Sequence, residues 1–284
     1  MTFSLPTAEL YVPDGLPPAE ALARTTHLAI GAHQDDLEIM AADGILQCFQ
    51  RPDRWFTGVV VTDGAGSPRE GLYGQYTDEM MRAIRRVEQK KAAFVGDFAA
   101  AILLDHPSAA VKDPREPRPV DDLVRVLEAT RPEVVYTHNL CDKHDTHIAV
   151  AWRAIAAIRR VAAASRPRRL YGCEVWRNLD WLRDEEKITF DLSAHQNLQM
   201  ALVGVFDSQI SGGKRYDLAT WGRRKGNATY AASHGTDQAE FASYAMDLTP
   251  LVEDPSLDPV AFALSAIERL RDDVAARLTR FRPA

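Results

Sequence analysis

An imidazole and two carboxylates follow the first apolar run of the chain. His33, Asp35 and Asp36 lie in the segment Ala-His-Gln-Asp-Asp, after Leu28-Ala-Ile-Gly31 and before a helical pattern. This pattern predicts a strand that runs into a tight turn and then a helix. Because ligands of α/β proteins bind at the carboxyl ends of strands, we expect these side chains to form a metal site with a general base beside it.

Two further histidines follow another predicted strand. The apolar run 132–136 precedes His144, Asp145 and His147, which open a helical pattern. Asp145 is the expected N-cap of that helix. His144 and His147 lie three residues apart, so both can face the strand ends. The two histidines are therefore expected beside the first group.

The residue types suit a catalytic zinc centre. Such centres take three protein ligands and keep one position for water, and His33, Asp36 and His147 would supply a His-Asp-His set. Zinc lowers the pKa of bound water toward ~7 and polarises a carbonyl group. Asp35 could take the proton of that water. His144 could stabilise the oxyanion or protonate the leaving amine.

The same motifs resemble the signatures of one enzyme family. Ala-His-Gln-Asp-Asp resembles the His-Pro-Asp-Asp signature of the PIG-L/LmbE-like zinc-dependent N-deacetylases, and His144-Asp-Thr-His147 resembles their His-Pro-Asp-His signature. Further matches follow in the same chain order, within residues 25–245: Thr62-Asp63-Gly64, Arg85 with Glu88, Asp142, and Ser208-Gln209.

This chain departs from the family pattern at a few positions. Gln34 replaces the usual Pro, Asp145-Thr146 replaces the usual Pro-Asp, and Gln199 stands where many members carry Lys. None of these changes removes a ligand or the base that the resemblance implies.

The resemblance implies a role for each matched residue. His33, Asp36 and His147 would hold one Zn²⁺ per chain, although other divalent metals suit the same ligands. Asp35 would be the general base and His144 its acid or electrophilic partner.

Three more residues receive roles from the resemblance. Asp142 would orient His144, and Arg85 and Asp105 would contact the substrate. The alternative for Arg85 is a surface ion pair with Glu88, three residues on along the same helix face. The alternative for Asp105 is a plain turn at the end of a strand.

Strand and helix patterns alternate along the chain. They predict an α/β fold: a Rossmann-like, three-layer αβα arrangement with a mostly parallel sheet and the metal site at the carboxyl ends of its strands. The strands are expected near residues 27–32, 57–62, 100–104, 133–137 and 169–175. The helices are expected near residues 36–50, 78–96, 120–129, 147–163 and 193–207.

A single domain over residues 1–284 is the expected organisation, because this length suits one large α/β domain. Residues 209–245 contain several glycines and little periodicity, which predicts an irregular lid or oligomer contact. Arg223–Lys225 and His234 lie in this segment, and either could reach the site; the alternative for His234 is a surface position. Residues 259–281 carry an apolar stripe typical of an amphipathic helix that packs on the domain or on another subunit.

Composition narrows the function classes. The formal net charge of −6 argues against a general nucleic-acid binder. Three cysteines without a Cys-x-x-Cys pair suit a reducing cytoplasm. No signal peptide and no apolar run of membrane-spanning length is visible. The first strand lacks a Gly-x-Gly-x-x-Gly turn, and Gly64-Ala-Gly66-Ser67 lacks the lysine of a phosphate-binding loop.

We therefore expect a cytoplasmic, zinc-dependent hydrolase that removes an N-acetyl group from an amino sugar or a related amine conjugate. The family resemblance and the C-terminal stripe also favour a homo-oligomer, with a trimer or hexamer as options. Two alternatives remain open: a metal-dependent phosphoesterase, which would often need a second metal, and a non-catalytic small-molecule binder on the same fold.

Overall fold

The computed structural model describes residues 1–283 and contains one eight-stranded sheet in the order β1-β4-β3-β2-β5-β6-β8-β7. The five central strands β4, β3, β2, β5 and β6 run parallel, whereas β1, β8 and β7 pair antiparallel at the edges. The strands are β1 (Glu9–Tyr11), β2 (His27–Gly31), β3 (Phe56–Thr62), β4 (Ala100–His106), β5 (Val134–His138), β6 (Arg169–Cys173), β7 (Lys187–Asp191) and β8 (Ala242–Asp247).

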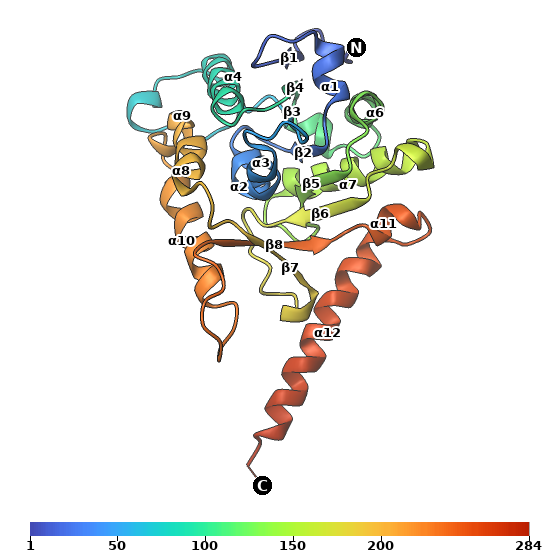
Figure 1. Ribbon diagram of the computed structural model, residues 1–284, viewed down its shortest axis with the longest axis vertical. Coiled ribbons are helices and arrows are strands. Elements are labelled where there is room, and N and C mark those ends of the chain that lie inside the picture. Colours follow the sequence, from blue (N-terminus) through green and yellow to red (C-terminus); the bar gives the residue numbers. More distant parts are fainter. Residues whose placement is uncertain (284) are drawn as a thin grey trace.

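Helices lie on both faces of the sheet (Figure 1). They are α1 (Pro18–Ala23), α2 (Asp36–Met40), α3 (Ala42–Cys48), α4 (Asp78–Val95), α5 (Ser108–Lys112), α6 (Arg118–Thr130), α7 (Asp145–Arg160), α8 (Gln196–Gly204), α9 (Asp207–Ile210), α10 (Tyr216–Thr229), α11 (Pro250–Glu253) and α12 (Pro259–Arg280). Short 3₁₀ turns occur at Gly71–Tyr73, Ala163–Ser165 and Asp184–Glu186.

Two apolar clusters form the core, one on each face of the sheet. Alternate residues of β2 enter different clusters: Leu28 and Ile30 pack with side chains of α6 and α7, whereas Ala29 packs with side chains of α2, α3, α4 and α8. All residues of β3 are buried, as expected for a parallel strand covered on both sides. The predicted three-layer α/β fold is confirmed.

The sheet places its switch point beside the predicted site. β2 pairs with β3 on one side and with β5 on the other, so the chain leaves these neighbouring strands toward opposite halves of the sheet. A crevice forms outside the carboxyl ends of strands at such a point. His33 follows β2, and His144 and His147 follow β5, so the topology brings the two histidine motifs together.

Several expected elements differ from those observed. The helix expected at 36–50 is two helices, α2 and α3, because the backbone at Ala41 leaves helical geometry (φ −108°, ψ 24°). The segment 209–245 is not irregular throughout, since it contains the 14-residue helix α10. The edge strands β1, β7 and β8 were not expected. The helix expected at 259–281 corresponds to α12.

Within residues 1–283, no helix combines the length and the apolar character that crossing a membrane requires.

Candidate metal centre

Three side chains from the switch point bring their ligand atoms together. Nδ1 of His33 lies 3.2 Å from Nε2 of His147 and 3.3 Å from Oδ2 of Asp36, and Nε2 of His147 lies 3.4 Å from Oδ1 of Asp36. Ligand atoms around a tetrahedral zinc with bonds of ~2.0–2.1 Å are separated by ~3.3–3.4 Å. The three residues therefore have a spacing that suits a zinc ion, with Asp36 facing His33 through Oδ2 and His147 through Oδ1.

The turn after β2 fixes the first two of these ligands. Asp35 adopts a left-handed backbone (φ 98°), and the next residue begins α2. Oδ2 of Asp36 accepts a hydrogen bond of 2.6 Å from the backbone N–H of His33, which closes the turn. Burial opposes ionisation of Asp36, but the imidazoles of His147 and His138 outweigh it and hold the pKa of Asp36 well below its usual range. The ionised form, which a metal ligand requires, is thus favoured for Asp36.

The carboxylate of Asp142 contacts the ring of His147 on the side away from His33 and Asp36. Oδ2 of Asp142 lies 3.2 Å from Nδ1 of His147, so Nε2 of the ring faces His33 and Asp36. Asp142 also accepts hydrogen bonds from the backbone N–H groups of Lys143, Trp176 and Arg177. The expectation that Asp142 orients His144 is therefore wrong: its carboxylate faces the ring of His147.

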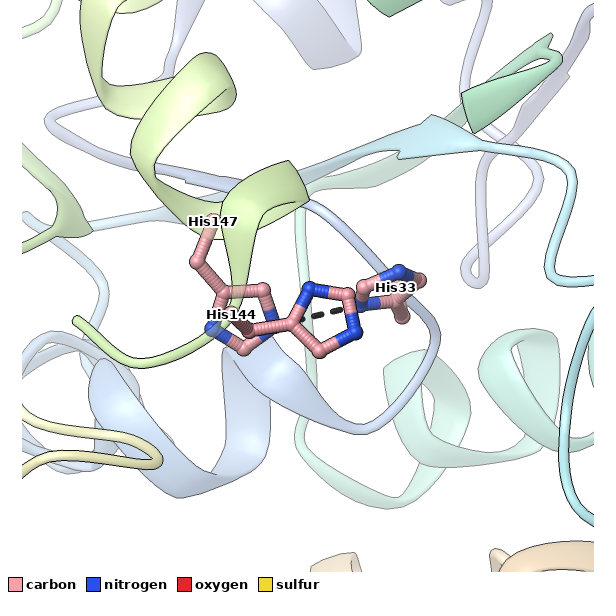
Figure 2. A group of neighbouring side chains, drawn as sticks. All are labelled: His33, His144 and His147. Atoms are coloured by element: carbon pink, nitrogen blue, oxygen red, sulfur yellow. Dashed lines mark hydrogen bonds between the residues drawn. The ribbon is translucent and has the colours of Figure 1, made fainter. Parts of the chain in front are cut away.

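His144 lies beside His33 and His147 (Figure 2). Its ring stacks on His147 with centroids 4.6 Å apart, and its Nδ1 accepts a hydrogen bond of 3.3 Å from the backbone N–H of Thr146. His144, and not Asp145, is therefore the N-cap of α7. Burial and the neighbouring His147 lower the pKa of His144. The neutral ring, with Nδ1 accepting, carries its proton on Nε2 and can donate it.

Asp35 is buried next to Asp36, and like His33 and Asp36 it lines a cavity at the carboxyl ends of the strands. Burial raises the pKa of Asp35 to about 8, although the guanidinium of Arg85 opposes this rise. Nη2 of Arg85 lies 3.8 Å from Oδ1 of Asp35. A carboxylate with such a pKa can accept and release a proton near neutral pH.

Arg85 is buried in the cavity wall and does not form the surface ion pair with Glu88 considered above. Its Nη2 donates to the carbonyl of Gln34 at 2.6 Å, and its Nη1 donates to Ser67 and to the carbonyl of Gly64. Glu88 instead accepts hydrogen bonds from Ser208. Arg85 therefore joins the loop after β3 to the turn that carries Asp35.

Asp105 lies outside the cavity. Its backbone adopts a left-handed conformation (φ 62°), and its carboxylate pairs with Arg86 of α4 at 2.7 Å. Asp105 does not line the cavity in the described part of the chain, so the expectation of a substrate contact is not met. His234 is exposed and away from the lining as well.

His138, at the end of β5, was missed by the sequence analysis. Its ring stacks on His147 at 3.9 Å, and its Nε2 lies 3.4 Å from Oδ2 of Asp36. The same Nε2 accepts a hydrogen bond of 2.9 Å from the backbone N–H of Ala32, which occupies the lone pair a metal would need. His138 therefore supports the ligands. Its position at a strand end was the only signal in the sequence.

A cavity of about 520 Å³ opens above these groups. The residues that line it include His33, Asp36, His144, Arg85, Gln209, Trp176 and Tyr216. The α/β fold therefore places a cluster of histidine and aspartate side chains, of the kind that could hold a metal ion, at the switch point with a cavity beside it.

Comparisons with known proteins show which family the central part of the chain resembles. Residues 28–158 match the family model described as PIG-L, GlcNAc-PI de-N-acetylase. No curated protein matches the chain. The match confirms the predicted resemblance to the PIG-L/LmbE-like family over residues 28–158, the segment that carries both histidine motifs.

Three solved structures illustrate the shared fold. One is N,N'-diacetylchitobiose deacetylase from Pyrococcus horikoshii, with 15% identity and a TM-score of 0.62 over 81% of this chain and 86% of that chain. Another is a conserved protein from Thermus thermophilus, with 19% identity and a TM-score of 0.60 over 82% and 99%. The third is GalB, the 4-carboxy-2-hydroxymuconate hydratase from Pseudomonas putida, with 15% identity and a TM-score of 0.57 over 79% and 96%.

Proposed function

We propose that the protein is a zinc-dependent hydrolase that removes the N-acetyl group of an amino sugar or a related amine conjugate. The observation that carries this proposal is the arrangement of His33, Asp36 and His147, whose ligand atoms are spaced as around a tetrahedral metal. Asp35 and His144 flank this position and line the cavity. The match to a de-N-acetylase family supports the same reaction.

The side chains divide the work of amide hydrolysis. Zinc, when bound, would supply a Lewis acid that polarises the carbonyl and makes water acidic. Asp35 accepts a proton from the attacking water as the C–O bond forms, and it returns that proton to the nitrogen as the C–N bond breaks. Nε2–H of His144 donates a hydrogen bond to the carbonyl oxygen as it gains negative charge. The products are acetate and a free amine.

Arg85 has two roles in the proposed reaction. Its charge lies close to Asp35 and favours the ionised form of that carboxylate. Its side chain also forms part of the cavity wall, where it would contact polar groups of the substrate. The backbone carbonyls that it binds keep it in place.

The experiment is a substrate panel assayed with purified protein. The fold also occurs in a hydratase, so the panel includes N-acetylated sugars, phosphate esters and an unsaturated carboxylic acid. We expect amine and acetate release from N-acetylated sugars, lost on chelation and restored by zinc. Turnover confined to the phosphate esters or to the unsaturated acid would reject the deacetylase proposal.

We further propose that the protein is a homo-oligomer assembled through α12. Figure 1 shows the C-terminal half of α12 extending away from the rest of the molecule. One face of the helix exposes apolar side chains in a repeat of alternating three and four residues, interrupted by Arg271: Val260, Leu264, Ile267, Val274, Leu278 and Phe281. Such a repeat is the seam of a coiled coil.

A second copy of the same helix suits this seam. The apolar positions lie almost symmetrically on either side of Arg271, so an antiparallel pair would place apolar side chains opposite one another. At the centre of such a pair the two Arg271 side chains would lie close together, each paired with Asp272 of its own copy at 2.9 Å.

A further inference from the structure

Helix α2 begins with two residues of the proposed site in an unfavourable conformation. Asp36 is the first residue of the helix, and Asp35 precedes it with a left-handed backbone (φ 98°), which is unfavourable for a residue with a side chain. Such a conformation persists only where the surrounding structure holds it. Because α2 has only five residues, its own hydrogen bonds are too few to do this. Other elements must therefore hold α2 in place.

Arg224 of α10 binds the last turn of α2. Its Nη2 donates to the carbonyl of Glu38 at 2.8 Å and to the carbonyl of Ile39 at 3.1 Å. A cation suits this place because the last carbonyl groups of a helix carry partial negative charge. Asp36 lies two residues before Glu38, which is about 3 Å along the helix axis. A shift of this turn would therefore also move the carboxylate of Asp36.

Arg85 of α4 binds the other end of the same segment. Its Nη2 donates to the carbonyl of Gln34 at 2.6 Å. The two arginines come from different helices and bind backbone carbonyls on either side of Asp35 and Asp36. Hydrogen bonds from a charged donor are stronger than those between neutral groups. The segment 34–39 is thus held at both ends by guanidinium groups.

Gln199 of α8 fixes the direction of the Arg224 side chain. Its Oε1 accepts a hydrogen bond of 2.9 Å from Nη1 of Arg224. Its amide nitrogen donates to the carbonyls of Leu192 and Ala194 at 2.7 and 2.8 Å, which determines the orientation of the amide. Arg224 and Gln199 are both buried, with exposed fractions of 3% and 2%. With Nη1 held by Gln199, Nη2 of Arg224 faces α2.

The partners of Arg224 are neutral oxygens. In the described part of the chain its guanidinium group donates to two backbone carbonyls and one side-chain amide. Burial lowers the pKa of Arg224 to about 10, although the charge of Glu174 opposes this change. Burying a cation without a directly bonded carboxylate costs stability. An arginine here is therefore better explained by what it binds than by its contribution to the stability of the fold.

We propose that Arg224 is a positioning residue of the metal centre, which holds α2 so that Asp35 and Asp36 keep their places. The consequence for zinc and for turnover rests on the proposed function, whereas the contact with α2 does not. Arg224 lies outside residues 28–158, the segment that matches the family model.

The test starts with Arg224→Met, which removes the donors and keeps a long side chain. We expect faster amide hydrogen exchange in peptides that cover α2. We also expect a zinc Kd about 10-fold higher than that of wild type. For the methyl glycoside of N-acetylglucosamine, kcat should fall about 10–100-fold. KM should change less than about threefold, because Arg224 is not among the described residues that line the metal cavity.

Two further variants separate positioning from a loss of stability. Arg224→Lys keeps a cation beside the same carbonyls and should lie between Arg224→Met and wild type in exchange, zinc Kd and kcat. Arg166 is the matched control, since it also donates to backbone carbonyls, those of Arg159 and Val252, but it precedes β6 at the amino ends of the strands. Arg166→Met should lower the melting temperature and leave the exchange of α2, the zinc Kd and kcat unchanged.

The exchange and zinc measurements need no turnover, so they separate this inference from the proposed function. If wild type releases no amine but Arg224→Met still loosens α2 and weakens zinc binding, the deacetylase proposal alone fails. Exchange of α2 as slow in Arg224→Met as in wild type would overturn the positioning role. Faster exchange with unchanged zinc Kd and kcat, or equal losses in Arg166→Met, would overturn it as well. A wild-type protein that binds no zinc would reject the metal centre and with it this role of Arg224.

Discussion

The carboxylate of Asp142 lies behind His147, on the side away from the other ligand atoms. Removing such a partner typically weakens metal binding by about 10–100-fold. We therefore expect Asp142→Ala to raise the Kd for zinc by this factor, measured by competition with a chromophoric chelator. Asp145→Ala changes an exposed aspartate on the same helix and serves as the control. An unchanged Kd in Asp142→Ala would contradict the contact with His147.

We propose that His144 has a different role from His33, Asp36 and His147. Its Nδ1 is occupied by the N–H of Thr146, which leaves Nε2–H to donate toward the cavity. We expect His144→Phe to lower kcat about 10²–10³-fold, as for loss of one oxyanion donor, and to leave zinc content unchanged. Loss of zinc on this substitution would make His144 a ligand instead.

The roles of some site residues could be predicted from the sequence, whereas those of others could not. His33, Asp36 and His147 occupy short motifs at strand ends, so their types and spacing indicate a metal site directly. The partner of Asp142 depends on how the first turn of α7 is oriented, and the role of His138 depends on pairing with the backbone of Ala32. Neither contact produces a local pattern in the sequence, so neither could be predicted from it.

His27, the first residue of β2, makes the stability of the folded state depend on pH. Burial lowers the pKa of His27 to about 4, below its usual value near 6.5. The folded state therefore favours the neutral ring, and stability present above pH 6.5 is lost as the pH falls toward 4. A shift of this size corresponds to about 3 kcal/mol at most.

Urea unfolding at pH 7.5, 5.5 and 4.5 tests this expectation. The free energy of unfolding of His27→Gln should fall less steeply over this range than that of wild type. Parallel curves for the two proteins would show that the protonation of His27 is not linked to unfolding.

The central strands and helices were predictable, but several edge elements were not. A strand such as β3 is buried on both faces and has a continuous apolar sequence, whereas β1 has three residues and β7 is half-exposed. Gly222 and Gly226 interrupt the pattern of α10, so its segment resembled a loop. The helix packs against β8 and α8, contacts that the local sequence does not indicate.

The exposed apolar seam of α12 predicts that the protein assembles into an oligomer through this helix. Leu264→Glu with Leu278→Glu places charges in the seam, and we expect light scattering to show a smaller particle than for wild type. Ala276→Glu with Thr279→Glu adds the same charge at exposed positions outside the seam and should leave the mass unchanged. Equal masses for all three proteins would reject assembly through α12.

The proposed function requires that Asp35, the buried acid beside the proposed metal ligands, takes part in the reaction. The most direct measurement is amine release from an N-acetylated sugar by wild type and by Asp35→Asn at equal zinc content. Because Asp35 is not among the ligands, we expect one zinc per chain in both proteins and a loss of turnover of at least about 10²-fold in the variant. Turnover near that of wild type in zinc-loaded Asp35→Asn would contradict the account.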